Sequence, residues 1–360
     1  MAKLVINQRI IDENNPTYFI ADIAANHDGS LERAKSLIYL AKASGADAVK
    51  FQHFRAEYIV SDQGFQSLGS KFAHQKEWDK SVFEVYKNAS LPWEWTLPLK
   101  KYCDELEIDF FSSPYDFETI EHLAPFVPAF KIGSGDITWT EILEKFCEYD
   151  KPIILATGSS DIIDVQRAVK TIFAKKRQLA LLQCNTNYTG SLENIKYVSL
   201  NVLKYYRNLY PEMVLGLSDH TPGHVTVLGA IALGARIIEK HFTDDNNRIG
   251  PDHKFSMNPQ TWKAMINDSR LLESSFGNFN KIVEENERET VILQRRCLTA
   301  QRDLSPGEII KRDMISVLRP APKDSIKPYD MDKIVGMRLF KGVAKGQALS
   351  WGHFKSGVND

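Results

Sequence analysis

The chain has 360 residues, of which 43% are hydrophobic and 25% are charged. This composition excludes a disordered or fibrous protein and gives enough length for one large domain and a smaller one. Its 45 basic and 46 acidic residues nearly cancel, so we expect neither nucleic acid nor an anionic membrane as a partner. Four widely spaced cysteines without a CxxC pair argue against a disulfide framework. Since the N-terminus lacks a signal-peptide core and no run approaches the ~20 apolar residues of a membrane span, the sequence predicts a cytoplasmic protein.

Short apolar runs alternate along the chain with longer segments of helical spacing. The runs are 18–24, 48–52, 109–113, 129–133, 152–158, 179–185, 213–220 and 236–242. Intervening segments such as 30–46 and 161–176 have apolar residues three and four apart and open with Ser or Asp, which suit N-caps. Strand followed by helix, eight times within about 240 residues, predicts an α/β fold of the (β/α)8 TIM-barrel type. An open doubly wound sheet is the alternative, but it would usually show a glycine fingerprint after the first strand.

The barrel prediction also locates the site, because enzymes of this fold carry their active sites at the C-terminal ends of the strands. Most of the runs begin apolar and end polar. The polar residues at these ends include Asp22, Lys50, Gln52, Ser113, Lys131, Ser134, Ser218, His220, Glu239 and His241. Successive strand residues point to opposite faces, so Glu239 and His241 would face the barrel mouth while Lys240 points away from it.

His220 and His241 end the seventh and eighth runs, which are neighbours in a closed barrel. Two imidazoles there would bind one divalent ion, with Glu239 and a substrate oxygen completing the shell. The alternative is two separate histidines that only form hydrogen bonds in the mouth. Asp219 and Asp252 are expected as further oxygen donors within reach of the same mouth, unless they are merely solvated.

Two lysines, Lys50 and Lys131, lie inside otherwise apolar runs with no acidic partner in the same run. A buried ammonium group is unfavourable without a counter-anion, so a ligand anion is the expected partner. Hydroxyl groups at Ser113, Ser134 and Ser218 would help to hold its phosphate or carboxylate. The alternative is that each lysine extends to solvent at the strand end. No P-loop is present, so no nucleotide is expected.

The composition changes near residue 278. Residues 281–296 are strongly charged and predict a linker or an exposed helix. From Cys297 onward, short β-prone pieces alternate with turns, which predicts a compact, mostly β domain of about 60 residues. The predicted division is a barrel domain over 1–278, a linker over 279–296 and a small β domain over 297–360.

The motifs NHDG, AVKFQ, FFSSPYD, AFKIGSGDIT, GLSDHTPG, IIEKHFT and GPDHKFSM resemble, in order, those of the sialic acid (nonulosonic acid) synthase family. Residues 298–320 and 335–349 are similar to the antifreeze-like (SAF, β-clip) domain that these synthases carry at the C-terminus. The resemblance implies a transferase that condenses phosphoenolpyruvate with an N-acylated hexosamine. The product would be a sialic-acid-type 2-keto-3-deoxy sugar acid.

The resemblance also implies roles for individual residues. His220 and His241 would hold a divalent ion, commonly Mn2+ with Mg2+ or Co2+ possible, and Glu239 would be a catalytic carboxylate. Phosphoenolpyruvate would be bound by Lys50, Ser113, Lys131, Ser134 and Ser218. The amino sugar would be bound by Asp22, Gln52, Tyr188, Asp252 and Arg319. Arg319 would reach the barrel of the other subunit in a domain-swapped homodimer.

Three positions depart from the family pattern, and they leave the acceptor sugar open. Asp22 stands where glutamate is usual, Ala156 stands where serine is usual, and the NTNYTG stretch around Tyr188 replaces one that commonly contains proline. N-acetylmannosamine, a 2,4-diacetamido-trideoxyhexose of the legionaminic type and its pseudaminic counterpart are all candidates. Two rival functions are a synthase acting on a phosphorylated aldose and a non-catalytic sugar-binding protein.

Overall fold

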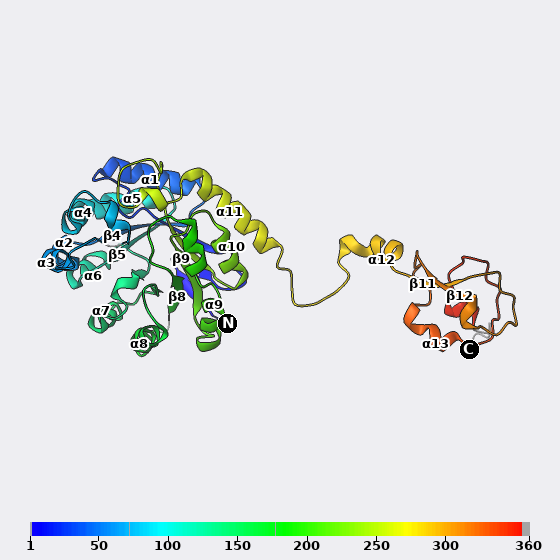
Figure 1. Cartoon of the computed structure of the whole chain (residues 1–360). Helices are drawn as coiled ribbons and strands as arrows, with labels where there is room; N and C mark the ends of the chain where they lie inside the picture. The colour runs from blue at the N-terminus through cyan, green and yellow to red at the C-terminus, as the bar shows by residue number, and fades with distance from the viewer. Residues whose placement is uncertain (1, 72, 177, 355–360) are drawn as a thin grey trace. The chain divides into compact units, whose positions relative to one another are not determined.

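The computed structural model describes residues 2–71, 73–176 and 178–354 of the chain. They form two compact units, Met1–Gly277 and Asn278–Asp360 (Figure 1). The first unit contains the predicted strand and helix repeat, and the second contains the predicted β module.

Eight parallel strands form the sheet of the first unit, in the order β5-β4-β3-β10-β9-β8-β7-β6. They are β3 (Tyr18–Asp22), β4 (Ala48–His53), β5 (Asp109–Pro114), β6 (Phe130–Ile132), β7 (Ile153–Ala156), β8 (Leu179–Cys184), β9 (Val214–Asp219) and β10 (Ile237–His241). The two ends of this order, β5 and β6, also lie side by side. The predicted eight-stranded barrel is therefore confirmed, with each strand inside or within two residues of the run that predicted it.

A helix follows each strand and covers the outside of the barrel. In chain order, these helices are α1 (Leu31–Ala43), α5 (Thr96–Glu105), α6 (Phe117–Leu123), α7 (Thr140–Phe146), α8 (Ile162–Phe173), α9 (Val202–Leu209), α10 (Val225–Ala232) and α11 (Pro259–Ser274). Helix α8 shows how the sequence sets them: the Asp161 carboxylate accepts hydrogen bonds from the backbone N–H groups of Ile163 and Asp164, which caps the helix. Between β4 and α5 the chain inserts α2 (Ala56–Ile59), α3 (Asp62–Ser67) and α4 (Val82–Ala89).

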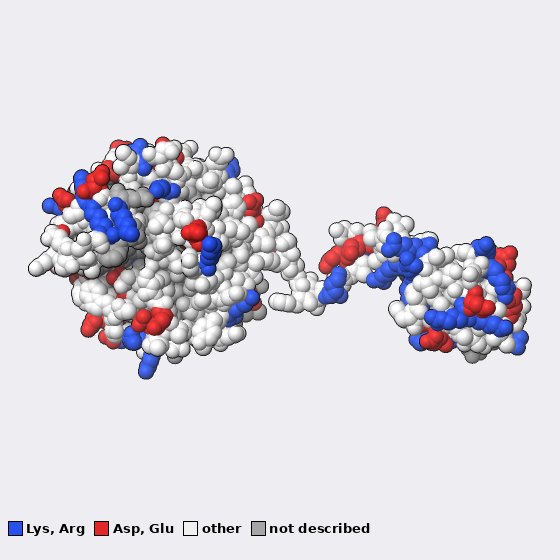
Figure 2. Space-filling model, viewed as in Figure 1, with Lys and Arg blue, Asp and Glu red and all other residues white. Residues whose placement is uncertain are grey.

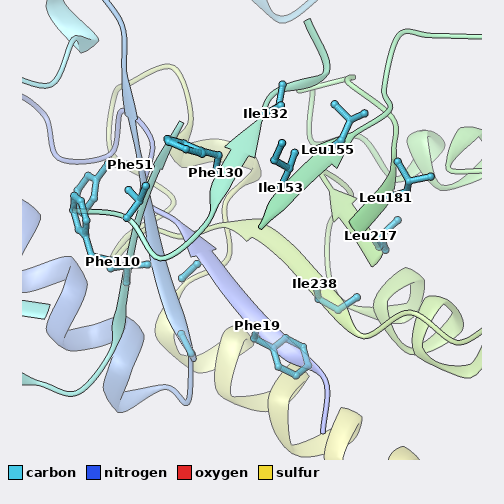
Figure 3. Packing of buried hydrophobic residues seen from close by; sticks show 14 of the residues in the cluster. Phe19, Phe51, Phe110, Phe130, Ile132, Ile153, Leu155, Leu181, Leu217 and Ile238 are labelled. Carbon is cyan, nitrogen blue, oxygen red and sulfur yellow. The ribbon is translucent and has the colours of Figure 1, made fainter. Parts of the chain in front are cut away.

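Strand alternation divides the core of the barrel unit into two layers. The outer layer packs strands against helices and includes the residues labelled in Figure 3, namely Phe19, Phe51, Phe110, Phe130, Ile132, Ile153, Leu155, Leu181, Leu217 and Ile238. The inner cluster includes Tyr18, Ile20, Ala48, Phe111, Ile154, Leu182, Val214 and Ile237. Gly216 makes room for this inner packing, because a Cβ there would lie 2.4 Å from the Ile237 carbonyl oxygen and 2.9 Å from the Leu182 side chain.

A hairpin that the sequence analysis did not predict precedes the barrel. Strands β1 (Leu4–Ile6) and β2 (Arg9–Ile11) pair in antiparallel fashion, and both turn residues, Asn7 and Gln8, have positive φ. Leu4, Ile6 and Ile11 are fully buried and belong to the inner cluster. The hairpin therefore extends the inner apolar core at the end of the barrel where the strands begin.

The second unit is small and built largely from short strands and turns. Strands β11 (Cys297–Ala300) and β12 (Ile315–Leu318) pair in antiparallel fashion, and helices α12 (Arg288–Gln294) and α13 (Met331–Ile334) belong to the same unit. Its core includes Leu298, Leu304, Ile310, Ile326, Ile334 and Leu349. Lysine and arginine side chains are interspersed with acidic ones on the visible face of this unit (Figure 2), in keeping with a formal net charge of -1 for the whole chain. Among the described residues, no helix is both long and apolar enough to span a membrane.

Candidate active site

One polar layer lies on top of the apolar inner layers of the barrel, at the C-terminal ends of the strands. Each of its members continues the inward-facing alternation of its strand. They are Asp22, Lys50, Ser113, Lys131, Cys184, Ser218 and Glu239, all at most 6% exposed. The structure thus brings together side chains from β3, β4, β5, β6, β8, β9 and β10 at one barrel mouth.

Both lysines of this layer are paired with carboxylates from other strands. Lys50 Nζ lies 2.7 Å from Asp22 Oδ2, and Lys131 Nζ lies 3.3 Å from Glu239 Oε1. The sequence analysis expected a ligand anion as partner because neither run contains an acidic residue, and the structure shows that carboxylate partners stand on other strands, β3 and β10. Burial would lower the pKa of Lys50, but the carboxylates of Asp22 and Glu239 raise it above its usual value. The paired carboxylates thus keep a buried ammonium group charged and in place.

Two oxygen atoms of the layer are buried without a hydrogen-bond partner among the described residues, Ser113 Oγ and Glu239 Oε2. The other oxygen of Glu239 accepts a hydrogen bond from Ser218 Oγ at 3.1 Å. Burial would raise the pKa of Glu239, but the ammonium groups of Lys131 and Lys50 lower it to about 2. Buried polar atoms normally have partners, so these two oxygens indicate a polar ligand at the mouth.

The two predicted histidines meet beside this layer. The ring centres of His220 and His241 are 5.4 Å apart. His220 Nδ1 lies 2.8 Å from the Asn185 carbonyl oxygen, to which it donates, so its Nε2 keeps a lone pair. Burial lowers the pKa of His220 to about 4 and that of His241 to about 3. Both imidazoles are therefore neutral at pH 7, which is the form that binds metal ions.

The pair of imidazoles fits one shared divalent ion. Ring nitrogens that share an ion at about 2.1 Å place the ring centres about 5 Å apart, close to the observed 5.4 Å. His241 Nδ1 is buried and makes no hydrogen bond to the part of the chain that the structure describes. In those same residues, no group of three or more His, Cys, Asp and Glu side chains is arranged to hold an ion. Two protein ligands would leave coordination positions for substrate or water.

Three residues predicted to contact a sugar surround the imidazoles. Gln52 Nε2 donates to Asp22 Oδ2 at 3.0 Å, and the Tyr188 ring centre lies 4.3 Å from that of His220. Asp252 Oδ2 lies 4.0 Å from His241 Nδ1, and burial raises the pKa of Asp252 to about 7. A partly protonated carboxyl group here would donate or accept a hydrogen bond.

A cavity of about 690 Å3 lies beside the residues that pack against the imidazoles. Tyr188 and Phe255 line it and also pack against the histidine rings, so the cavity adjoins the histidine pair. Its other walls come from the insertion after β4, with His74 and Trp78, and from the loop after β10, with Arg248. Its volume is in the range of small-molecule sites.

Comparisons with known proteins agree with this arrangement. The NeuB family model matches residues 37–281, and the SAF domain model matches residues 295–355. The chain belongs to the NeuB family. It is 34% identical over 350 residues to the N,N'-diacetyllegionaminic acid synthase of Legionella pneumophila, covering 94% of this chain and 95% of that protein. It is 30% identical over 341 residues to the pseudaminic acid synthase of Campylobacter jejuni, covering 94% and 96%.

The fold matches a solved member of the sialic acid synthases. The crystal structure of N-acetylneuraminic acid (sialic acid) synthetase from Leptospira borgpetersenii, in complex with citrate, aligns with a TM-score of 0.71 and 26% identity. The alignment covers 80% of this chain and 95% of that chain. The barrel mouth described above therefore belongs to a NeuB-family fold with an SAF domain.

Not every residue predicted for this NeuB-family site lies in the polar layer. Ser134 begins the short 3-10 helix Ser134–Asp136 after β6, and its Oγ accepts a hydrogen bond from Gly158 N at 2.9 Å. Arg319 follows β12 in the second unit and is exposed. Asp219 was expected in the mouth, and that expectation is wrong. Its carboxylate lies 2.6 Å from Lys240 Nζ on the helix-facing side, because residue 219 alternates with Ser218.

The sequence analysis missed residues that shape the site from outside the strand ends. His74 and Trp78 come from the insertion after β4, and the Asn185 carbonyl group orients His220. The long interval between the second and third apolar runs was the available signal for the insertion. No sequence pattern identifies a backbone carbonyl as the partner of a ring nitrogen.

Proposed function

We propose that this NeuB-family chain is a nonulosonic acid synthase that condenses phosphoenolpyruvate with an N-acylated hexosamine. One observation carries the proposal: two paired ammonium groups, two neutral imidazoles and two buried oxygens without a partner in the described residues face the same barrel mouth. Its relatives named as legionaminic and pseudaminic acid synthases, which match almost the whole chain, support the same reaction class.

Phosphoenolpyruvate carries two anionic groups, and the polar layer offers two cations for them. Lys50 and Lys131 stand on β4 and β6, so they can bind the carboxylate and the phosphate at separate points and fix the orientation of the enol between them. The hydroxyl groups of Ser113, Ser134 and Ser218 would add hydrogen bonds to the same oxygens. Because Asp22 and Glu239 already hold the ammonium groups in place, the site would need little reorganisation when the anion binds.

His220 and His241 would hold the divalent ion, for which Mn2+ is our first candidate. When bound, the ion would supply Lewis acidity to the carbonyl oxygen of the open-chain sugar. The reaction forms a bond between C3 of phosphoenolpyruvate and the aldehyde carbon. Water then adds to C2, and the bond from C2 to the phosphate oxygen breaks, so that the products are the 2-keto acid and inorganic phosphate. Glu239 Oε2, ionised and without a partner in the described chain, would orient or deprotonate that water.

The cavity beside the imidazoles has aromatic walls that suit an acceptor with apolar substituents. The lining includes the rings of Trp78, Tyr188 and Phe255, which suit methyl and acetamido groups. We therefore propose a 2,4-diacetamido-trideoxyhexose of the legionaminic type as the first acceptor to test, with N-acetylmannosamine and the pseudaminic precursor as alternatives. Three cationic side chains, Lys80, Arg248 and Lys254, also line the cavity, so a phosphorylated acceptor is kept as an arm of the test below.

Phosphate release provides the test. Purified protein with Mn2+ and phosphoenolpyruvate is offered each of the three neutral sugars and N-acetylmannosamine 6-phosphate, and products are identified by mass spectrometry. With at least one neutral sugar, we expect phosphate release and a product whose mass equals the sum of the masses of that sugar and pyruvic acid. Turnover with the 6-phosphate alone would support a synthase for phosphorylated sugars. No phosphate release with any acceptor would support the sugar-binding alternative.

The proposed dimer can be tested by complementation. In a swapped homodimer, Arg319 would act on the partner's barrel, as the family resemblance implies. Mixed dimers of His241→Ala and Arg319→Ala chains would then contain one intact site in two. Because half of randomly reassembled dimers are mixed, about a quarter of wild-type activity should return. If Arg319 acted within its own chain, the mixture would stay inactive.

A further inference from the structure

A buried ion pair lies directly behind the two histidines, on the helix-facing side of the barrel. Lys240 and Asp219 have side chains that are each 1% exposed, and Lys240 Nζ lies 2.6 Å from Asp219 Oδ2. Elsewhere this layer between strands and helices is predominantly apolar, as Leu217 and Ile238 show on the same two strands. Burying two charged groups in such a layer is unfavourable, so we expect this pair to have a role other than packing.

All the hydrogen bonds of this pair lead to residues around His220. The ammonium group of Lys240 donates to Asp219 Oδ2 and also to the Thr221 carbonyl oxygen at 2.7 Å, so it holds the residues on both sides of His220. Asp219 accepts from Thr221 N at 3.1 Å and from the hydroxyl groups of Thr221 at 2.9 Å and Thr226 at 2.7 Å. These bonds fix the direction of the chain as it leaves β9.

Backbone pairing alone does not fix the two imidazoles relative to each other. The ladder between β10 and β9 ends at the pair Lys240 and Asp219, one residue before the histidines. His241 remains in register with Asp22 of β3, whereas His220 lies beyond the end of β9. Beyond the end of this ladder, the Lys240 ammonium group ties the residues on both sides of His220 to the strand of His241.

The energetics favour a geometric role over a stabilising one. A buried ion pair gives little net stability, because removing two charges from water offsets most of their attraction. Its short and directional bonds nevertheless restrict the groups that they join. Outer contacts that orient metal-binding histidines change metal affinity by about 10- to 100-fold in other proteins.

We propose that Asp219 and Lys240 are positioning residues that set the spacing of His220 from His241 and thereby the affinity for the divalent ion. The inference rests on the proposed function only in assigning the ion to these two imidazoles. Neither residue contacts the substrate site, since both side chains point to the opposite face of the sheet from Ser218 and Glu239.

The test is to titrate the metal-stripped full-length chain with Mn2+ in the absence of phosphoenolpyruvate. The electron paramagnetic resonance signal of the free ion reports how much Mn2+ is bound. The double variant Asp219→Asn/Lys240→Met removes both charges but keeps an oxygen to accept from Thr221 N. We expect its dissociation constant for Mn2+ to rise about tenfold. If that variant does not fold, Thr226→Val removes one hydroxyl group that orients Asp219, and we expect a rise of about twofold.

A matched control separates positioning from loss of stability. Like Asp219, Asp47 pairs with a cationic side chain, in this case Arg9, and it accepts a hydrogen bond from Phe19 N at 2.8 Å. It lies just before β4, at the opposite end of the barrel. Asp47→Asn should lower the melting temperature and leave the Mn2+ dissociation constant unchanged. The proposal would be overturned if the folded double variant Asp219→Asn/Lys240→Met kept the wild-type dissociation constant for Mn2+. Where the double variant does not fold, an unchanged constant in Thr226→Val would overturn it in the same way. Wild-type protein that binds no Mn2+ would also overturn it. Wild-type protein that binds Mn2+ but releases no phosphate would contradict the proposed function alone.

Discussion

The two ends of the barrel are built from the same eight strands but differ in what their inward side chains do. Near the strand starts, Tyr18, Val214 and Ile237 pack with the hairpin residues Leu4 and Ile6 in a buried and mostly apolar cluster. Near the strand ends, the same alternation presents Asp22, Lys50, Ser113, Lys131, Ser218 and Glu239. The comparison teaches that one or two polar residues at the ends of most strands are enough to build a site, provided that the layer beneath carries the stability.

The largest effect that tests this division is expected from His241→Ala. Loss of one of the two proposed ligands would remove Lewis-acid stabilisation of about 4 kcal/mol, which corresponds to about a thousandfold lower kcat/KM. Phosphate release measures the activity, and thermal unfolding followed by circular dichroism measures the fold. We expect a cooperative transition that stays near that of the wild type, because the residue lies above the packed layers. Loss of cooperative unfolding would show that the upper end also carries the fold.

Ile237→Ala tests the opposite end of the same strand. Ile237 is fully buried in the inner cluster, four residues before His241. Truncation leaves a cavity, so the free energy of unfolding should fall by about 2–5 kcal/mol in urea titrations. The kcat/KM measured at a temperature where the variant is folded should remain near that of the wild type. A large loss of activity in the folded variant would mean that the two ends are mechanically coupled.

Most of the barrel could be predicted from the sequence because its strands are short apolar runs and its helices carry N-caps such as Asp161. The hairpin before β3 was missed, although its two short strands, Leu4–Ile6 and Arg9–Ile11, flank a two-residue turn. The turn residues are Asn7 and Gln8, and Gln is a weak signal for the left-handed conformation that this turn needs. Packing against the barrel interior, which sequence periodicity does not encode, stabilises it.

The inward-facing polar residues could also be predicted, because alternation within a strand fixes which side chains share a face. Their partners could not. Asp22 pairs with Lys50 because the register of the neighbouring strands β3 and β4 places them opposite each other. Glu239 pairs with Lys131 only because the closed barrel brings β10 across from β6. The expectation for Asp219 failed for a related reason: residue type indicated a ligand, whereas the alternation that placed Ser218 inward placed Asp219 outward.

The pH dependence of the free energy of unfolding tests the helix-facing side of the barrel near the strand ends. His53 is fully buried there, with its ring nitrogens 2.6 Å from Ser112 Oγ and 2.8 Å from Thr96 Oγ1. Burial lowers its pKa from 6.5 to about 3, so below pH 6.5 the unfolded chain binds a proton that the folded chain does not. Stability is therefore present above pH 6.5 and is lost as the pH falls, by about 2 kcal/mol at pH 5 from this residue alone.

Urea titrations at pH 7.5 and pH 5 would measure this loss in the wild type and in His53→Gln. The amide of glutamine does not titrate and can keep one hydrogen bond, so we expect the variant to be less stable at pH 7.5 but to lose about 2 kcal/mol less between the two pH values. An equal loss in both proteins would assign the acid sensitivity to other groups.

The smallest expected effect concerns the one position where the polar layer is apolar. Ala156 ends β7, is 2% exposed and belongs to the inner cluster, at the level where neighbouring strands carry polar side chains. Ala156→Ser would add a hydroxyl group facing the bound anion, and one hydrogen bond of about 1 kcal/mol should lower the KM for phosphoenolpyruvate about fivefold with the sugar KM unchanged.

The matched control for Ala156→Ser is Ala180→Ser on β8, in the fully buried apolar part of the same cluster. A hydroxyl group there has no ligand to meet, so the variant should lose stability, by about 1–3 kcal/mol for an unpaired buried group, without a change in either KM. A lower KM for phosphoenolpyruvate in both variants would show that the boundary between the two ends lies deeper than Ala156. No change in Ala156→Ser would place the anion away from β7, nearer to Lys50 and Ser113 on the opposite side of the mouth.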